Sequence, residues 1–185
     1  MKNAEKQKAE KTWRMTIPTQ LAIFTAVLTR QGVKKISYRP VADPVPRRRM
    51  PGGRLPLAIR NNAAKLDAWL RAYASGKKCE YRVPLDLSGQ SNFRVRVWRH
   101  LRRIAFGKTI AYGQLAQKVG CRSARAIGAA CGANPLPILI PCHRVVAQRG
   151  LGGWSGLHGW KEILLRHEYL RVATRKNLTE KRKTH

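Results

Sequence analysis

The first half of the chain alternates short apolar runs with polar turns. Apolar runs at residues 21–29 and 35–38 stand on either side of 31–32 (Gln-Gly), and this spacing predicts two β-strands joined by a turn. From Asn62 the apolar residues recur at helical spacing, which predicts a helix ending near Gly76. The apolar face of that helix holds Leu66, Trp69, Leu70 and Tyr73.

The second half predicts three short helices, because polar capping residues precede three apolar segments. Ser91, Thr109 and Ser123 are the expected N-caps, since their hydroxyl oxygens can accept hydrogen bonds from the first unpaired helix amides. Gly120 lies between the second and third helices, so this pair predicts a helix-turn-helix. The buried stripe of the first helix is expected to hold Phe93, Val97, Trp98, Leu101 and Ile104.

The third of these helices, residues 124–132, consists mostly of Ala and Gly. Such a helix can pack tightly inside the protein, or it can approach another surface closely, such as a nucleic-acid groove. Arg125 places a positive side chain beside the positive end of the helix, which suits phosphate or DNA. The pattern alone favours neither interpretation over the other.

Charge narrows the class of partner. The 185 residues include 38 Lys and Arg against 9 Asp and Glu, a formal net charge of +29. Residues 87–161 contain no carboxylate, whereas a merely solvated face usually carries interspersed acids, so we expect a polyanion-binding surface. Charge alone does not distinguish DNA, RNA and acidic lipid. The longest apolar stretch, residues 21–28, is far too short to span a bilayer, which argues against a membrane protein.

One of the four cysteines is a candidate nucleophile. Cys79, Cys121, Cys131 and Cys142 show no metal-binding spacing, so we expect reduced thiols and no metal site. Residues 134–141 bend at prolines and then carry an apolar run into the interior, where Cys142 follows. The next residues, His143 and Arg144, predict an electropositive setting that favours thiolate. The alternative is a buried structural cysteine beside a chance histidine.

Residues 141–145, Pro-Cys-His-Arg-Val, resemble the signature of the methylated-DNA–protein-cysteine methyltransferases, also called alkylguanine-DNA alkyltransferases. The resemblance extends over about residues 62–170 and includes 112–116 (Tyr-Gly-Gln-Leu-Ala), 124–128 (Ala-Arg-Ala-Ile-Gly) and 164–168 (Leu-Leu-Arg-His-Glu). The N-terminal third resembles the family only weakly.

The family resemblance implies an α+β fold. We expect an N-terminal domain at 16–88 with a small sheet and a helix. A mostly helical C-terminal domain at 89–172 is expected to carry the winged-helix-like helix-turn-helix and the reactive cysteine. Residues 1–15 are polar and predict a flexible basic arm, and residues 173–185 predict a basic tail.

The resemblance also implies catalytic roles. Cys142 would take the alkyl group from the carbon-6 oxygen of alkylated guanine, with the carbon-4 oxygen of alkylated thymine as an additional candidate. His143 would deprotonate Cys142 through a water, and Glu168 would orient His143. Asn134 would support the turn that presents the site, and Tyr112 would hydrogen-bond the departing guanine. Adjacent side chains in an extended segment point apart, so proton transfer from Cys142 to His143 needs a bridging water or a bend.

The binding residues that the resemblance implies fall into two groups. The base pocket would be lined by Tyr112, Val145, Trp154, Ser155 and Gly156. The DNA-binding residues would be Ala124, Arg125, Ala126, Gly128 and Ala129. Arg125 would enter the duplex in place of a flipped nucleotide, and the small residues would let the helix sit in the minor groove.

The chemistry of alkyl transfer agrees with these roles. Displacement at carbon favours a soft anionic nucleophile such as thiolate, and a stacked base cannot reach a buried cysteine unless it is flipped. The thioether product has no evident route to hydrolysis, so we expect one turnover per molecule. The expected partner is double-stranded DNA. We expect a monomer without cofactor, metal or membrane association, located in the cytoplasm or nucleoid, or in the nucleus if the source is eukaryotic.

Two departures from the family pattern and two alternatives remain. The glycine loop carries Leu157 where the family usually has its second glycine, which affects the shape of the pocket and the alkyl size it tolerates. No Cys precedes Cys79 and no His precedes His100, so we expect no N-terminal zinc site. A non-catalytic relative that binds alkylated DNA would lack Cys142. A cationic DNA-packaging protein would not need Cys142 in register with an acid such as Glu168.

Overall fold

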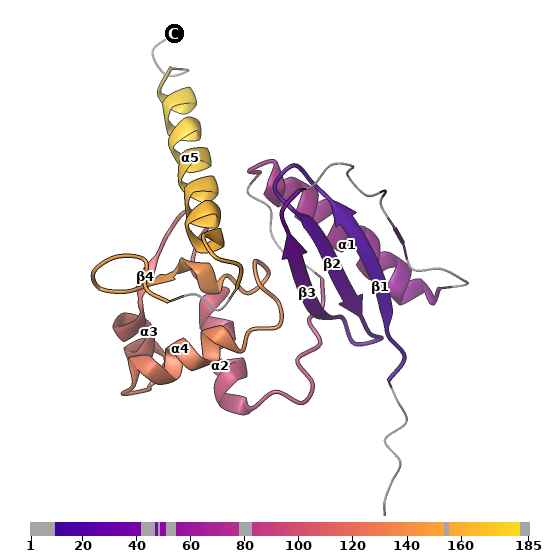
Figure 1. Ribbon diagram of the computed structural model, residues 1–185, viewed down its shortest axis with the longest axis horizontal. Coiled ribbons are helices and arrows are strands. Elements are labelled where there is room, and N and C mark those ends of the chain that lie inside the picture. The colour runs from indigo at the N-terminus through magenta and orange to yellow at the C-terminus, as the bar shows by residue number, and fades with distance from the viewer. Residues whose placement is uncertain are drawn as a thin grey trace, which may run out of the picture.

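Three antiparallel strands form the N-terminal sheet of the computed structural model (Figure 1). The structure describes residues 10–41, 47, 49–50, 55–77, 83–153 and 156–181, with side chains as far as residue 173. The strands are β1 (Trp13–Pro18), β2 (Ile23–Leu28) and β3 (Val33–Arg39), in the order β1-β2-β3. The two predicted strands are confirmed as β2 and β3.

Strand β1 was not predicted. Its residues alternate, with Trp13, Met15 and Ile17 buried and Arg14 and Thr16 between them, so the period-2 signal is present in the sequence but falls at the end of the predicted polar arm. The strand begins at Trp13, three residues before the boundary at residue 16, so the end of the expected flexible arm is part of the sheet. The rest of that arm, residues 1–9, lies outside the described residues.

Helix α1 (Leu57–Ala74) lies beside the sheet (Figure 1) and buries the predicted apolar residues Leu66, Leu70 and Tyr73. It begins five residues earlier than predicted, and Ile59 extends its buried face. The sequence also predicts a basic loop around Arg47–Arg54, of which the structure describes only residues 47, 49 and 50.

Three further helices form the second domain: α2 (Asn92–Leu101), α3 (Tyr112–Val119) and α4 (Ala124–Gly132). Two predicted caps are confirmed, because the hydroxyl of Ser91 accepts from the amide of Arg94 at 3.4 Å and that of Ser123 from the amide of Ala126 at 3.2 Å.

The prediction for Thr109 is wrong. The N-cap of α3 is Ala111, whose amide donates to the side-chain oxygen of Gln114 at 3.1 Å. Residues 110–111 instead form the short strand β4 (Ile110–Ala111), which pairs in parallel with β5 (Val145–Val146). Because residues 110–111 are extended in this pairing, the helix cannot start directly after Thr109, and its N-cap moves to Ala111.

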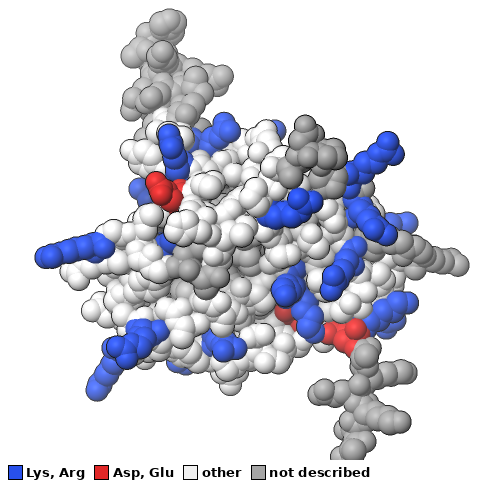
Figure 2. Space-filling model, in the orientation of Figure 1, with Lys and Arg blue, Asp and Glu red and all other residues white. Residues whose placement is uncertain are grey.

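Helix α5 (Trp160–Lys181) closes the structure and runs between the two parts of the chain (Figure 1). Its helical backbone continues to Lys181 through residues predicted as a separate basic tail. Within the described part of the chain, no helix combines the length and apolar character needed to cross a bilayer. Figure 2 shows many basic and few acidic side chains on the visible face.

Contacts between the two parts fix the loop that leads to Cys142. The amide of Ile36 on β3 donates to the carbonyl of Pro135 at 2.9 Å, so the sheet edge holds the start of that loop. The rings of Tyr38 and Trp160 lie 4.8 Å apart, which packs the sheet against the first turn of α5. The loop that leads to Cys142 is therefore anchored to the N-terminal sheet, which also packs against α5.

Candidate active site

Cys142 begins a short 3-10 turn, η1 (Cys142–Arg144), and is only 5% exposed. The side-chain amide of Asn134 donates to the carbonyl of Ile140 at 2.8 Å and to Sγ of Cys142 at 3.1 Å. Its oxygen accepts from the amide of Leu136 at 2.9 Å. Asn134 therefore ties both ends of the loop together and places a donor on the sulfur.

The backbone of this loop is strained at Ile138. Its φ of 73° lies in the left-handed region, which costs a β-branched residue energy, and it is the one described residue other than glycine with positive φ. The amide of Ile140 donates to the carbonyl of Leu136 at 2.8 Å and closes the turn around Ile138. Burial of Ile138 and this hydrogen bond hold the strained conformation four residues before Cys142.

The ionisation of Cys142 differs from the expectation. Burial raises the pKa of the thiol, while the hydrogen bond from Asn134 and the positive charge of Lys161 act in the opposite direction. Arg144 does not supply the expected electropositive setting, because its guanidinium is engaged by Glu168. Burial thus outweighs the groups that favour thiolate, and the pKa of Cys142 in the free protein is raised, in contrast to the prediction of a thiolate-favouring setting.

His143 is completely buried and neutral. Burial lowers its pKa, and the neighbouring Glu168 only partly opposes this effect. Nε2 of His143 lies 2.8 Å from Oε1 of Glu168, so the carboxylate assigns the proton to Nε2 and leaves Nδ1 as the basic nitrogen. Nδ1 has no hydrogen-bond partner among the described residues. The histidine is thus oriented with an available lone pair.

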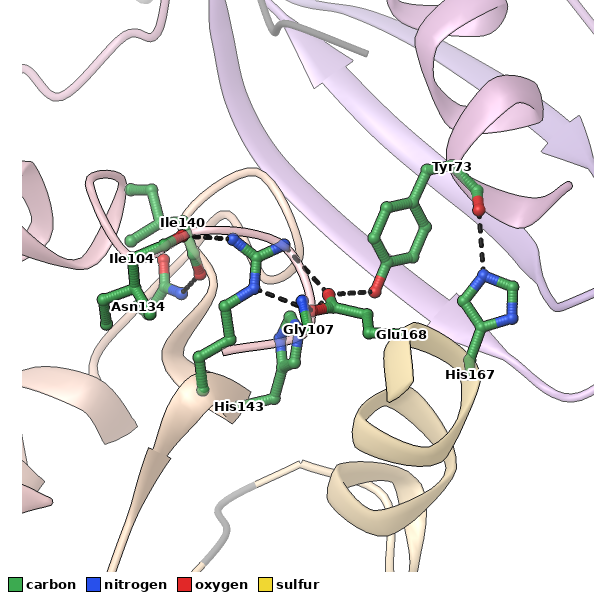
Figure 3. Close-up of polar contacts among 9 residues, drawn as sticks. Tyr73, Ile104, Gly107, Asn134, Ile140, His143, His167 and Glu168 are labelled. Carbon is green, nitrogen blue, oxygen red and sulfur yellow. Dashed lines mark hydrogen bonds and ion pairs between the residues drawn. The ribbon is translucent and has the colours of Figure 1, made fainter. Parts of the chain in front are cut away.

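Glu168 accepts five hydrogen bonds in the buried interior (Figure 3). Oε1 accepts from Tyr73 at 2.9 Å, from His143 and from Arg144, and Oε2 accepts from the Gly107 amide at 2.8 Å and again from Arg144. Burial alone would raise the pKa of Glu168, but the hydrogen bonds from His143 and Arg144 and the positive charge of Arg144 hold it far below its usual range. Glu168 is therefore a fixed anion.

A pocket of about 530 Å³ opens over Cys142 and gathers six of the predicted site residues. Its other lining residues in the described part of the chain are Cys131, Gly132 and Gly153. The predicted residues that it brings together are Tyr112, Ala124, Arg125, Gly128, Ala129 and Cys142. Arg125 is exposed at its rim, so a cation stands beside an otherwise largely apolar opening.

Other predicted residues lie elsewhere. Ala126 and Gly156 do not line this pocket, and Val145 is fully buried with its amide donating to the carbonyl of Cys142. The Val145 amide is therefore not free for a base, contrary to the expectation. Trp154 and Ser155 lie outside the described residues.

Tyr112 and Lys161 meet at the edge of the pocket. The hydroxyl of Tyr112 donates to the carbonyl of Gly153 at 3.3 Å, and Nζ of Lys161 donates to the same carbonyl at 3.1 Å and to the Tyr112 hydroxyl at 3.4 Å. Burial raises the pKa of Tyr112 to about 12, so its hydroxyl keeps its proton at neutral pH. Tyr112 can therefore donate to a developing negative charge.

Sequence reasoning missed Tyr73 and Gly107 as partners of Glu168 and Lys161 as the cation that acts on Cys142. Tyr73 belongs to the apolar face of a predicted helix, and this pattern does not show where its hydroxyl points. Lys161 is only 3% exposed. Because lysine is seldom buried, nothing in the sequence distinguishes Lys161 from the many other basic residues of the chain.

The sequence matches the family model described as "6-O-methylguanine DNA methyltransferase, DNA binding domain" over residues 92–170. A methylated-DNA–protein-cysteine methyltransferase of Mycolicibacterium paratuberculosis is 45% identical over 98 residues, which cover 52% of this chain and 59% of that relative. The aligned region thus spans less than two thirds of the relative's length. A protein of Thermus thermophilus named "DNA base-flipping protein" is 35% identical over 156 residues, which cover 83% of this chain and 98% of that protein.

Solved structures match both domains. The crystal structure of the Mycobacterium tuberculosis O6-methylguanine methyltransferase is 30% identical with a TM-score of 0.67, and the match covers 87% of this chain and 94% of that one. The Mycobacterium tuberculosis protein in complex with DNA is 31% identical with a TM-score of 0.66, over 84% of this chain and 92% of that one. The expected α+β fold is confirmed.

Proposed function

Because the chain belongs to the O6-methylguanine DNA methyltransferase family, we propose that it repairs DNA by moving an alkyl group from the carbon-6 oxygen of guanine to Sγ of Cys142. The observation that carries this proposal is the placement of Cys142 in a pocket of about 530 Å³, with a donor from Asn134 on its sulfur and a buried histidine–glutamate pair beside it. These groups supply a nucleophile, its orientation and a base.

The first step is removal of the thiol proton. A water between Sγ of Cys142 and Nδ1 of His143 would pass that proton to the histidine, whose other nitrogen is fixed on Glu168. Glu168 then stabilises the imidazolium without taking the proton, because its own pKa lies far below the usual range. Lys161 favours the thiolate electrostatically.

The second step breaks the bond between the alkyl carbon and the guanine oxygen while the carbon–sulfur bond forms. The electron pair moves onto guanine, which regains a neutral form by receiving the proton that left the thiol. The protonated hydroxyl of Tyr112 at the pocket edge can hydrogen-bond the charge as it develops. The product is S-alkylcysteine, and its thioether bond makes each molecule react once.

DNA is proposed to lie across α4 with the damaged guanine flipped into the pocket. Ala124, Gly128 and Ala129 line the opening with little bulk, which permits close approach to the minor groove. Arg125 stands exposed at the rim, where it can fill the space that the flipped nucleotide leaves. We propose the carbon-4 oxygen of alkylated thymine as a secondary substrate, and a monomer as the active form.

The direct test uses duplex DNA with a radiolabelled methyl group on guanine. We expect label on the peptide that contains Cys142, to about one equivalent per protein, and none in the Cys142→Ala variant. Cys131→Ala is the matched control, since this buried thiol lines the same pocket but burial raises its pKa to about 12. Label that persists in Cys142→Ala, or is absent from the wild type, would refute transfer to Cys142.

A second candidate function is binding without transfer, because the Thermus thermophilus relative that aligns over most of its length is named a base-flipping protein. This candidate predicts duplex binding at alkylated guanine with no label on protein. The presence of Cys142 with its oriented partners favours transfer over binding alone.

A further inference from the structure

A second cleft lies behind the reactive turn, where the two domains meet. Its volume is about 740 Å³. Its walls come from α1, from the C-terminal end of α2 and from the loops that follow α2 and precede Cys142. Its lining includes Trp69, Lys77, Arg99, Arg103, Phe106 and Arg144.

Positive charge collects in this cleft from separate elements. Lys77 follows α1, whereas Arg99 and Arg103 lie at the end of α2, and all three are exposed. No Asp or Glu is among the described lining residues. Basic residues at the end of α2 complement the helix dipole, but this does not account for Lys77 on the facing wall. Cations gathered without acids repel one another unless an anion lies between them.

Aromatic rings lie beside these cations. Trp69 is half-buried and stacks on Tyr73 with ring centroids 5.5 Å apart, and Phe106 meets the edge of Tyr73 at 5.8 Å. The guanidinium of Arg144 lies 5.8 Å from the Phe106 ring. A small inorganic anion makes no use of aromatic surface. Cations combined with an accessible ring are instead the arrangement by which proteins bind nucleic-acid strands.

The cleft is separate from the pocket over Cys142. The two share no lining residue among those that the structure describes: Pro141 and Arg144 line the cleft, while Cys142 lines the pocket. The turn η1 therefore separates the two openings. A duplex seated on α4 occupies the pocket side and leaves the cleft available.

We propose that this cleft binds a second segment of nucleic acid through its phosphodiester backbone, with Trp69 stacking on an unpaired base. Lys77, Arg99 and Arg103 contact phosphates, and the ring of Trp69 provides the platform. The inference extends the proposed DNA partner and is independent of alkyl transfer. It assigns a binding role to part of the net charge of +29.

The test compares two double variants of the full chain that each remove two positive charges. Arg99→Ser with Arg103→Ser removes cations from the cleft, and Arg60→Ser with Lys65→Ser removes exposed cations of α1 outside its lining. Binding of a fluorescent oligothymidine of about 12 nucleotides, and of a duplex of similar length, is measured by anisotropy over a range of salt. Trp69→Leu tests stacking.

We expect the cleft variant to bind oligothymidine about tenfold more weakly, with a salt slope reduced by about 1–2, and the control to change less than about twofold. Trp69→Leu is expected to weaken oligothymidine binding more than duplex binding. Equal losses in both double variants, or no loss in either, would overturn the proposal. A Trp69→Leu loss confined to the duplex would overturn stacking on an unpaired base.

Methyl transfer from a short alkylated duplex to Cys142 is measured in the same variants. Unchanged transfer with weakened oligothymidine binding supports a site separate from the reaction. A parallel loss of transfer and binding contradicts that separation. If the wild type transfers no label, the proposed function fails, while the comparison of cleft and control variants still decides whether the cleft binds nucleic acid.

Discussion

Glu168 is the residue on which the proposed site depends most, because its carboxylate organises both a base and a structural cation. Glu168 fixes the tautomer of His143, and its negative charge compensates the positive charge of the buried Arg144. A carboxylate with two oxygens offers about four lone-pair positions, so five donors saturate it. Removing any one of these donors therefore tests how much its hydrogen bond to Glu168 contributes to stability.

Tyr73→Phe removes one of these donors without changing the packing of the ring. We expect the free energy of unfolding to fall by about 1 kcal/mol, because Oε1 of Glu168 loses a buried hydrogen bond. Urea denaturation measures this change. Tyr169→Phe, at a 68% exposed position, is the control and should have little effect. Equal stability of the two variants would contradict a contribution of the Tyr73 hydroxyl.

Lys161→Gln is expected to raise the pKa of Cys142, because the lysine charge lowers that pKa in the folded protein. Methyl transfer near neutral pH should therefore slow, and the variant should recover towards the wild-type rate as the pH rises. The measurement is the rate of labelling of Cys142 as a function of pH. Lys108→Gln, at an exposed position, is the control. A loss that is the same at every pH would argue against an electrostatic role.

At the scale of elements, α4 resolves the two interpretations of an Ala- and Gly-rich helix. One face packs inward through Ile127, Ala130 and Cys131, while Ala124 and Ala129 are exposed at the pocket. A Cβ added at Gly128 would meet only the Tyr112 ring, at 4.0 Å. The small residues on this side are therefore not required by packing in the free protein.

Gly128→Leu is expected to leave the thermal stability unchanged or slightly higher, since leucine favours helix more than glycine by about 0.8 kcal/mol. The same change should slow transfer from duplex DNA by about tenfold or more, because the added side chain occupies the opening. Thermal unfolding and labelling of Cys142 are the measurements. Gly113→Leu adds the same bulk to α3, where nothing lies within 4 Å of the added Cβ. Similar transfer in both variants would contradict a close approach of α4 to DNA.

Elements with a local signal could be predicted, and those fixed by distant contacts could not. The caps at Ser91 and Ser123 are set by adjacent residues, so their pattern sufficed. Thr109 carries an equally good signal, but residues 110–111 pair with a strand that comes over thirty positions later. Likewise, Cys142 and Glu168 were identified from family motifs, whereas their partners Lys161 and Tyr73 depend on how the domains pack.

At the scale of the whole molecule, buried ionisable groups make stability depend on pH. Burial lowers the pKa of His143, so the unfolded chain takes up a proton there at a higher pH than the folded protein does. The contribution of His143 to the free energy of unfolding is present above the pKa that this histidine has in the unfolded chain. It is lost as the pH falls through that pKa. Glu168, whose folded pKa is also lowered, adds a further loss at more acidic pH.

We therefore expect the urea midpoint to fall as the pH drops below about 6.5, the ordinary pKa of histidine. The reason is preferential protonation of His143 in the unfolded state. His143→Gln should show a smaller fall over the same range, and His158→Gln, at an exposed position, should behave like the wild type. A wild-type midpoint that rises on acidification would contradict a buried neutral His143.

The order in which the chain is made follows from the position of Glu168. The carboxylate lies on α5, while its donors come from α1, the Gly107 turn and η1, so the nucleophile is synthesised before the acid that organises its base. A nascent chain that ends before α5 holds Cys142 and His143 but no group that fixes the histidine tautomer. The competence proposed for Cys142 thus requires that α5 has been made. Each molecule is proposed to react only once. An unfinished chain, which lacks α5, is therefore not expected to alkylate Cys142 before its synthesis is complete.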